Sequence, residues 1–103
     1  MNLQKLTIKA QEALQQAQQY AQEYSHGQID NEHLFYGIIS VDQHIVPYLL
    51  KKLGVNQSLL QQVLDKELHI KANVTGAQLS MAPETGKTIN DALIRAKKMN
   101  DEF

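Results

Sequence analysis

The sequence contains no cysteine and no excess of charge of one sign. Among its 103 residues the formal net charge is −1. Without cysteine, disulfide frameworks, thiolate zinc sites and cysteine nucleophiles are excluded. The near balance of charge removes the strongest electrostatic reason to expect nucleic acid or an anionic membrane as a partner.

Long apolar runs are also absent. No run approaches the roughly 18–20 residues needed to cross a bilayer, and Met1–Lys5 lacks the charged start and apolar stretch of a signal peptide. We therefore predict a cytoplasmic protein with neither a membrane nor a nucleic acid as partner. The length fits one small globular domain, and 43% of the residues are hydrophobic.

Apolar residues recur at helical spacing in the first segment, and most of the polar remainder is glutamine. Residues three and four apart share one stripe of a helix. Because the stripe is rich in alanine, we expect a second helix of the same chain to pack closely on it. Thr7 is the predicted N-cap, and Gly27 is available for a left-handed cap at the end. The stripe consists of Leu3, Leu6, Ala10, Ala13, Leu14, Ala17, Ala21 and Tyr24.

Four further helices are predicted by capping residues and periodicity. They begin after Asp30, at Ile45, after Asn56 and near Ala82 or Pro83, and the last runs to Asn100. Apolar residues do not recur at helical spacing in the stretch 69–79, which predicts a loop there. The class is therefore all-α, with about five helices and one longer loop. The inward residues of the helix over 57–68 would be Leu59, Leu60, Val63, Leu64 and Leu68.

An internal repeat links the first predicted helix to the fifth. A shift of 75 positions places Leu14 on Ile89, Ala17 on Ala92 and Ala21 on Ala96. The first copy is followed by His26, Ile29 and Glu32-His33-Leu34, and later by Leu53-Gly54-Val55-Asn56. In order and spacing, these residues resemble the Clp N-terminal repeat that opens AAA+ unfoldases and disaggregases, the ClpB type most closely.

The resemblance implies an all-α Clp N-domain-like pseudo-repeat, two repeats of about four helices each. It covers residues 1–103 as one incomplete domain, with a first repeat at about 4–68, a linking loop at about 69–80 and the start of a second repeat at about 81–103. Phe103 precedes the position where a second Ile-x-x-Glu-His-Leu would begin, so we interpret the chain as truncated within its second repeat. Part of the fifth helix should then be uncovered, which predicts marginal stability or self-association.

In function, the resemblance implies a substrate-recruiting domain without enzyme activity of its own. Such a domain binds exposed hydrophobic segments of unfolded or aggregated polypeptides in an apolar groove between the repeats. The rest of the hexameric AAA+ chaperone, which uses ATP and Mg²⁺ and works with the DnaK chaperone system, would lie outside these 103 residues. No cofactor is expected in this chain.

The resemblance also suggests residues for the binding surface. Thr7 and Asp101 align with positions that help define it, although a helix cap alone would explain Thr7. Ile89 would form part of the groove wall, with Leu93 and Leu14 as weaker candidates for which core packing is the alternative. Glu32 aligns with a glutamate that recognises phosphorylated arginine in the related ClpC proteins, but a first-turn charge is the simpler interpretation.

Other chemistry has little support in the sequence. Thr85-Gly86-Lys87-Thr88 lacks the earlier glycine of a phosphate loop, because Met81 stands there, and it falls within a predicted helix. The histidines share no metal spacing, so capping or exposed roles are predicted for them. The four histidines are His26, His33, His44 and His69.

The alternative function is a helical oligomerisation module, since the seam of the first helix also satisfies a three–four repeat.

Overall fold

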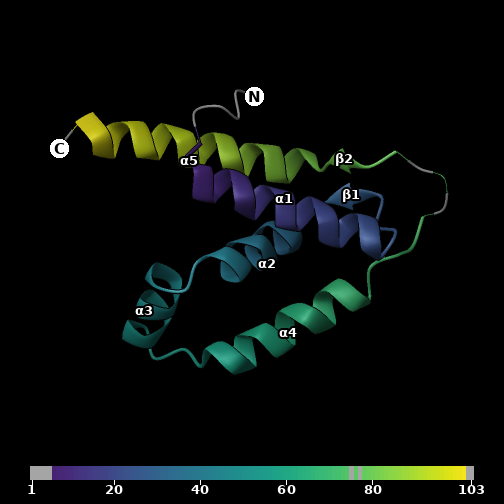
Figure 1. The fold of residues 1–103 in the computed structure, drawn as a ribbon, viewed down its shortest axis with the longest axis horizontal. Helices are drawn as coiled ribbons and strands as arrows, with labels where there is room; N and C mark the ends of the chain where they lie inside the picture. Colours follow the sequence, from purple (N-terminus) through teal and green to yellow (C-terminus); the bar gives the residue numbers. More distant parts are fainter. Residues whose placement is uncertain (1–5, 75, 77, 102–103) are drawn as a thin grey trace.

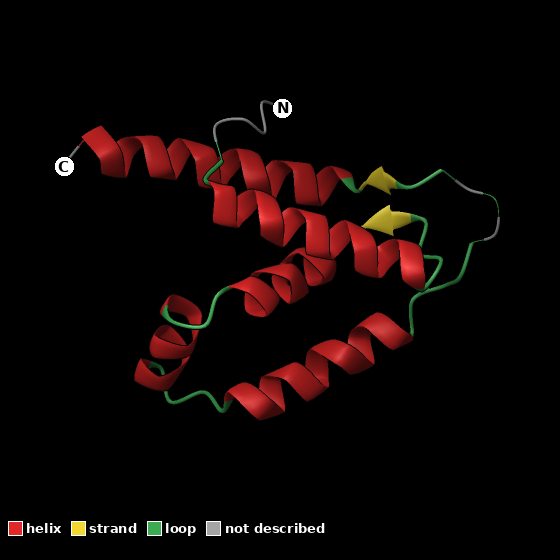
Figure 2. Ribbon diagram, viewed as in Figure 1, coloured by secondary structure: helices red, strands yellow, loops and turns green. Residues whose placement is uncertain are grey.

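Five helices and one short pair of strands make up the computed structural model, which describes residues 6–74, 76 and 78–101 (Figure 1). This confirms the all-α class predicted from periodicity. The two strands lie side by side and are only two residues long each (Figure 2). The elements are α1 (Ile8–Glu23), β1 (Gln28–Ile29), α2 (Asn31–Val41), α3 (Ile45–Lys52), α4 (Gln57–His69), β2 (Ser80–Met81) and α5 (Pro83–Asp101).

Side-chain caps fix where the helices begin. The Thr7 hydroxyl accepts a hydrogen bond from the Ala10 amide at 3.1 Å, and the Asn56 side chain accepts one from Leu59 at the same distance. Each cap satisfies an amide that has no partner within its helix. Gly54, just after α3, has a φ of +74°, a conformation that glycine adopts without strain. These caps confirm the predicted starts of α1 and α4.

Asp42 joins α2 to α3. Its carboxylate accepts hydrogen bonds from the amides of His44, Ile45 and Val46 at 3.0, 3.0 and 2.7 Å. These backbone hydrogen bonds, that from His44 first, lower the pKa of Asp42 because they favour its charged form. The carboxylate thereby holds the first turn of α3 at the end of α2.

The end of α1 differs from the prediction. Ser25, not Gly27, takes the left-handed conformation, with a φ of +55°. The amide of His26 donates to the carbonyl of Ala21 at 2.8 Å, and the amide of Ser25 donates to that of Gln22 at 3.2 Å. These two bonds define a Schellman motif, whose left-handed position is usually glycine. The predicted glycine cap was therefore wrong by two residues.

Ser25→Gly is expected to raise the free energy of unfolding by about 0.5–1 kcal/mol, because glycine adopts a positive φ without the steric cost that a Cβ adds. Urea unfolding followed by circular dichroism measures the change. Ser25→Ala serves as the control, since it keeps a Cβ at the same positive φ and should bring no gain. No gain for Ser25→Gly would show that the serine is not strained.

The main packing interface lies between α1 and α2. The buried stripe of α1 consists of Ala13, Leu14, Ala17, Tyr20 and Ala21. Gly37 of α2 lies directly against the backbone of α1, at Ala13 and Ala17. Small residues on both sides bring the two helices this close, which confirms the prediction that a helix of the same chain covers the alanine stripe.

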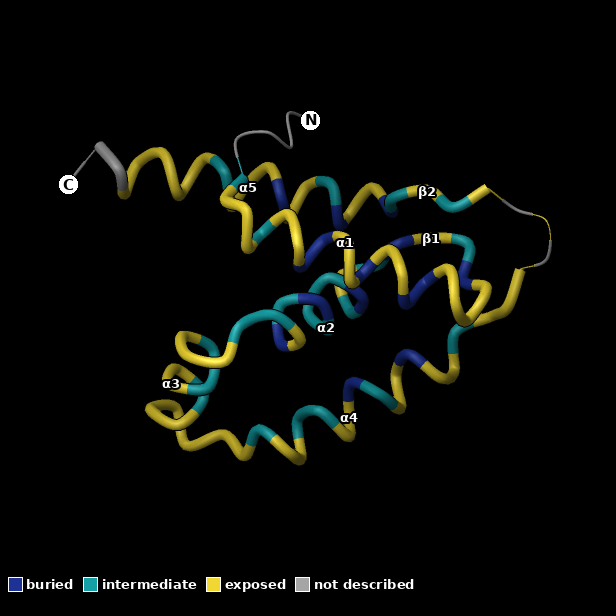
Figure 3. The backbone as a smooth tube through the Cα atoms, in the orientation of Figure 1, coloured by how far each residue is buried: buried dark blue, intermediate teal, exposed yellow. Residues whose placement is uncertain are grey.

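The helix α4 buries less of its surface than predicted. Leu64 and Leu68 are buried and form a cluster with Tyr20 and Ile39. Leu59 and Val63, however, are 59% and 52% exposed, so the prediction that they face inward was wrong for both. Figure 3 shows α3 and α4 as mostly exposed or intermediate along their length. The predicted inward set is wider than the side of α4 that the fold buries, which contains Leu64 and Leu68.

The strands β1 and β2 pair in parallel, with Gln28 opposite Ser80 and Ile29 opposite Met81. No strand was predicted, because two residues are too few to show a period. The pairing places the start of α5 beside the segment that precedes α2. The first half of α5 is anchored by the buried Thr85 and Ile89. Its second half exposes apolar residues, as predicted: Ala92, Ala96 and Met99.

Candidate functional site

The first predicted site residue, Thr7, lies at the exposed N-terminus of α1. Its hydroxyl oxygen accepts the Ala10 amide, so the capping role is confirmed. The hydroxyl hydrogen and the methyl group are what Thr7 can offer to a bound chain. A role in binding remains a prediction.

The apolar candidates occupy different depths. Leu14 and Ile89 are only 9% and 5% exposed. They pack in the interior, so a bound chain would reach them only if the neighbouring helices moved. Leu93, one turn after Ile89 on α5, is half-buried and is the accessible member of this set.

The charged candidates are not brought together with Thr7. Asp101 is the last residue of α5, and its side chain lies outside the described part of the structure. Glu32 is in the first turn of α2, where its carboxylate lies 3.1 Å from the Lys71 ammonium. His33, the neighbour of Glu32, packs against Tyr20 near the end of α1, whereas Thr7 caps its start. Most of the length of α1 therefore lies between Glu32 and Thr7.

A depression that the sequence did not predict lies where the start of α1 meets the end of α2 and the start of α3. Its volume is about 290 Å³. The floor is formed by apolar residues, among them Ala13 and Ile38, and Lys9 and Asp42 supply charges of both signs at the margin. The lining residues are Lys9, Ala10, Ala13, Ile38, Val41, Asp42, His44 and Ile45.

An exposed apolar side chain extends this depression. Ile45, one of the lining residues, is 67% exposed. Thr7 caps the turn of α1 that contains Lys9, which connects the predicted residue to the depression. We name this surface the α1–α3 surface and define it by the lining residues of the depression. An apolar surface with a few charges at its margin suits weak, sequence-tolerant binding of an apolar segment.

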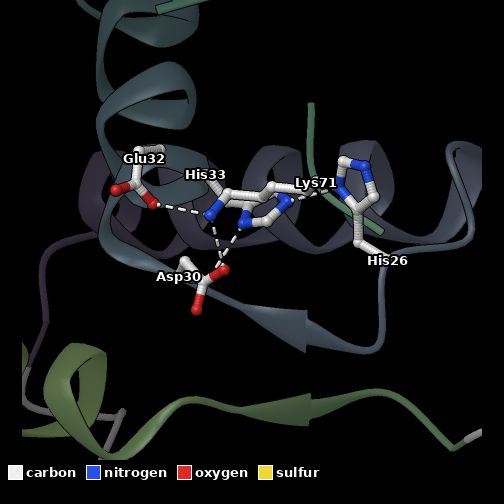
Figure 4. Close-up of polar contacts among 5 residues, drawn as sticks. All are labelled: His26, Asp30, Glu32, His33 and Lys71. Carbon is white, nitrogen blue, oxygen red and sulfur yellow. Dashed lines mark hydrogen bonds and ion pairs between the residues drawn. The ribbon is translucent and has the colours of Figure 1, made fainter. Parts of the chain in front are cut away.

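A second cluster lies at the opposite end of the α1–α2 pair (Figure 4). His33 is fully buried and His26 is 7% exposed, so the exposed role predicted for histidines was wrong for both. His33 Nδ1 accepts the amide of Asp30 at 2.9 Å, which gives His33 the predicted capping role. The Nε2 atom of His33 lies 2.7 Å from Nδ1 of His26.

Lys71, which lies in the connection that follows α4, is the last member of this cluster. Its ammonium lies 2.8 Å from the carboxylate of Asp30 and 3.1 Å from that of Glu32. Partial burial works against the charged form of Lys71, but the two carboxylates outweigh it, and the pKa of Lys71 is raised. Because Glu32 is already paired with Lys71, its carboxylate is less available to bind a positively charged group.

Within the described residues, no group of three or more histidine, aspartate or glutamate side chains has the geometry of a metal site. Nor does that part of the chain contain a helix with the length and hydropathy of a membrane span. Thr85-Gly86-Lys87-Thr88 lies in the first turns of α5, which confirms that it is helical and not a phosphate loop. The Thr85 hydroxyl is buried and has no hydrogen-bond partner among the described residues.

Comparison with known proteins gives one consistent answer. The sequence model of the Clp repeat (R) N-terminal domain matches residues 5–103. The chaperone protein ClpB of Bacteroides thetaiotaomicron is 30% identical over 103 residues, and that of Porphyromonas gingivalis is 28% identical over the same length. ClpB of Clostridium perfringens is 29% identical over 104 residues. In each case the whole chain is matched, and it spans 12% of the length of the relative.

Proposed function

Because this chain belongs to the Clp repeat N-terminal domain family, we propose that it recruits unfolded or aggregated polypeptides to a ClpB-type disaggregase. The observation that supports this most is the α1–α3 surface, an apolar depression bordered by the exposed Ile45 and a few charges. Such a surface has no requirement for a particular sequence, which suits partners that share only exposed apolar segments.

The rest of the proposed protein would carry out the steps that this chain does not. In a hexamer, several copies of this domain would act together, so that weak single contacts add to a higher avidity. ATP and Mg²⁺ would be used by ATPase modules outside these 103 residues, and the DnaK system would also act through those parts, in the cytoplasm. The contribution of this chain is binding alone.

The test is binding to a reduced and carboxymethylated protein that cannot refold, measured by fluorescence anisotropy. We expect weak binding to the unfolded probe and none to its native form. Ile45→Ser should weaken binding about fivefold, because roughly 1 kcal/mol of apolar contact is lost. Ile70→Ser is the matched control: Ile70 is 71% exposed, as Ile45 is 67% exposed, but it lies at the end of α4.

A third variant separates the two candidate surfaces. Leu93→Ser changes the accessible member of the groove suggested by the family resemblance, without altering the α1–α3 surface. If Leu93→Ser weakens binding and Ile45→Ser does not, the polypeptide binds along α5. If neither variant differs from Ile70→Ser, or if the wild-type chain does not bind the unfolded probe at all, the proposed recruiting function is wrong.

The second candidate function, an oligomerisation module, cannot use the seam that first suggested it. Three residues at that three–four spacing, Ala13, Ala17 and Tyr20, are buried against other parts of this chain. What favours association is α3, which contains no buried residue and exposes Ile45, Tyr48 and Leu49. Size-exclusion chromatography with light scattering distinguishes the functions. A stable oligomer that is indifferent to unfolded protein would favour the module.

A further inference from the structure

The contact between His26 and His33 defines the protonation state of both rings. The backbone amide of Asp30 can only donate, so Nδ1 of His33 is the acceptor and its hydrogen is on Nε2. That Nε2–H group donates to Nδ1 of His26 at 2.7 Å, so His26 carries its own hydrogen on Nε2. The three groups form one chain of hydrogen bonds, and Figure 4 shows the two rings side by side. With the hydrogens placed in this way, both imidazoles are neutral.

A proton on either ring breaks this chain. A charged His33 would direct an Nδ1–H group at the amide of Asp30, and a charged His26 would direct one at the Nε2–H group of His33. The surroundings also disfavour a charged imidazole. Burial lowers the pKa of His33 to about 4, and His26 contributes to this shift. Burial, and then the charge of Lys71, lower the pKa of His26 as well.

The same cluster ties the connection after α4 to the end of α1. The amide of Val74 donates to the carbonyl of Ser25 at 2.7 Å, and Asn73 forms an isolated antiparallel bridge with His26. Lys71 adds its two ion pairs. These contacts are few, and those of Lys71 are partly exposed, so each contributes little free energy. Residues 71–74 are therefore held mainly by the segment that contains His26.

We propose that the His26–His33 hydrogen bond is a pH-sensitive latch, and that proton uptake by either ring releases residues 71–74 from the end of α1 while the α1–α2 pair stays folded. The Ala13–Gly37 contact that holds α1 to α2 lies toward the other end of the pair, away from the latch. The first segment to open is thus the one that the two histidines hold.

The groups that surround the latch come from every element packed against it. Lys71 opposes a charge on either histidine, and Asp30 favours one. The other titratable or charged neighbours are Tyr20 and Tyr24 of α1, Glu32 of α2, and His69 of α4.

The direction in which pH changes the population of the open latch follows from the linkage between opening and proton binding. A released histidine takes up a proton near pH 6.5, whereas the latched His33 does so only near pH 4. Between these values the open state binds more protons than the closed one. Each proton taken up in this way raises the open population about tenfold for every unit by which the pH falls. The latch is closed above about pH 6.5 and opens progressively below it.

Amide hydrogen exchange of the wild-type chain between pH 7.5 and 5, corrected for the intrinsic rates, tests the proposal. We expect the protection of the Val74 amide to fall about tenfold per pH unit below pH 6.5. Protection of the Ala17 amide in α1 should change less than threefold over the same range. Ring ¹⁵N shifts at pH 7.5 should show both histidines neutral, with the hydrogen of each on Nε2.

Two variants complete the test. The double variant His26→Gln/His33→Gln should abolish the pH dependence at Val74, because the two amides can accept and donate in the same places without titrating. His44→Gln, at an exposed histidine whose side chain makes no cap hydrogen bond, should retain it. If the double variant does not fold, the wild-type titration and the single variant His26→Gln, which should reduce the pH dependence, take its place. The proposal would be overturned if the protection of the Val74 amide did not depend on pH, or if Val74 and Ala17 lost protection equally.

Discussion

Gly37→Ala is expected to lower the free energy of unfolding by about 3 kcal/mol. A Cβ on Gly37 would overlap the backbone carbonyl oxygen of Ala13, and it would lie 2.9 Å from the carbonyl carbon of Ala13 and 3.2 Å from the amide nitrogen of Ala17. Backbone atoms cannot rotate away as a side chain can, so α1 and α2 must separate. Overpacking of this kind costs about 1–3 kcal/mol or more, and it also outweighs the better helix propensity of alanine.

Urea unfolding followed by circular dichroism measures this loss. Ser40→Ala is the control, because Ser40 lies one turn away on the same helix with an exposed side chain. It should change the free energy of unfolding by less than about 0.5 kcal/mol. If Gly37→Ala were as stable as the wild-type chain, the close approach of α1 and α2 would be wrong, and with it the position of the α1–α3 surface.

Leu68→Ala is expected to lower the free energy of unfolding by about 3 kcal/mol. Leu68 is fully buried in α4, in a cluster with Tyr20, Ile39 and Leu64. Removing its side chain deletes the apolar contacts and leaves a cavity, which together cost about 2–5 kcal/mol. The same cluster holds α4 against α1 and α2, so the variant should also unfold with a broader transition if α4 detaches first.

The matched control is Leu59→Ala on the same helix, since Leu59 is 59% exposed. The same chemical change there should cost less than about 1 kcal/mol, because little apolar contact is lost. Chemical denaturation of the two variants under one set of conditions gives the comparison. Equal losses would mean that α4 is rotated about its axis relative to the described structure.

The two candidate binding regions differ in how far the sequence could identify them. Thr7 was predicted as a cap from its place just before the apolar stripe of α1, and as a binding residue from the family resemblance. Leu93 was suggested by family resemblance, and the structure shows that it is accessible. The α1–α3 surface was missed, because Lys9, Ile38 and Ile45 meet only after α2 folds back along α1.

The sequence by itself determined the five helices, their caps at Thr7, Asp30 and Asn56, and the family. Each of these depends on residues within a few positions of one another, or on an ordered pattern along the chain. Hydrogen bonds within a helix and at its caps are local, so their signals survive in the sequence. The alanine stripe also predicted a close helix neighbour, since small side chains along one face leave room for a second helix to approach.

Only the tertiary structure decided what depends on distant residues. It selected Leu64 and Leu68 over Leu59 and Val63 as the buried side of α4, because one stripe alone faces Tyr20 and Ile39. It also joined the strands β1 and β2, which are 50 residues apart in the chain and too short to show a period. The latch is of the same kind: the role of a histidine is set by its burial and its partners, and neither can be read from its neighbours in the sequence.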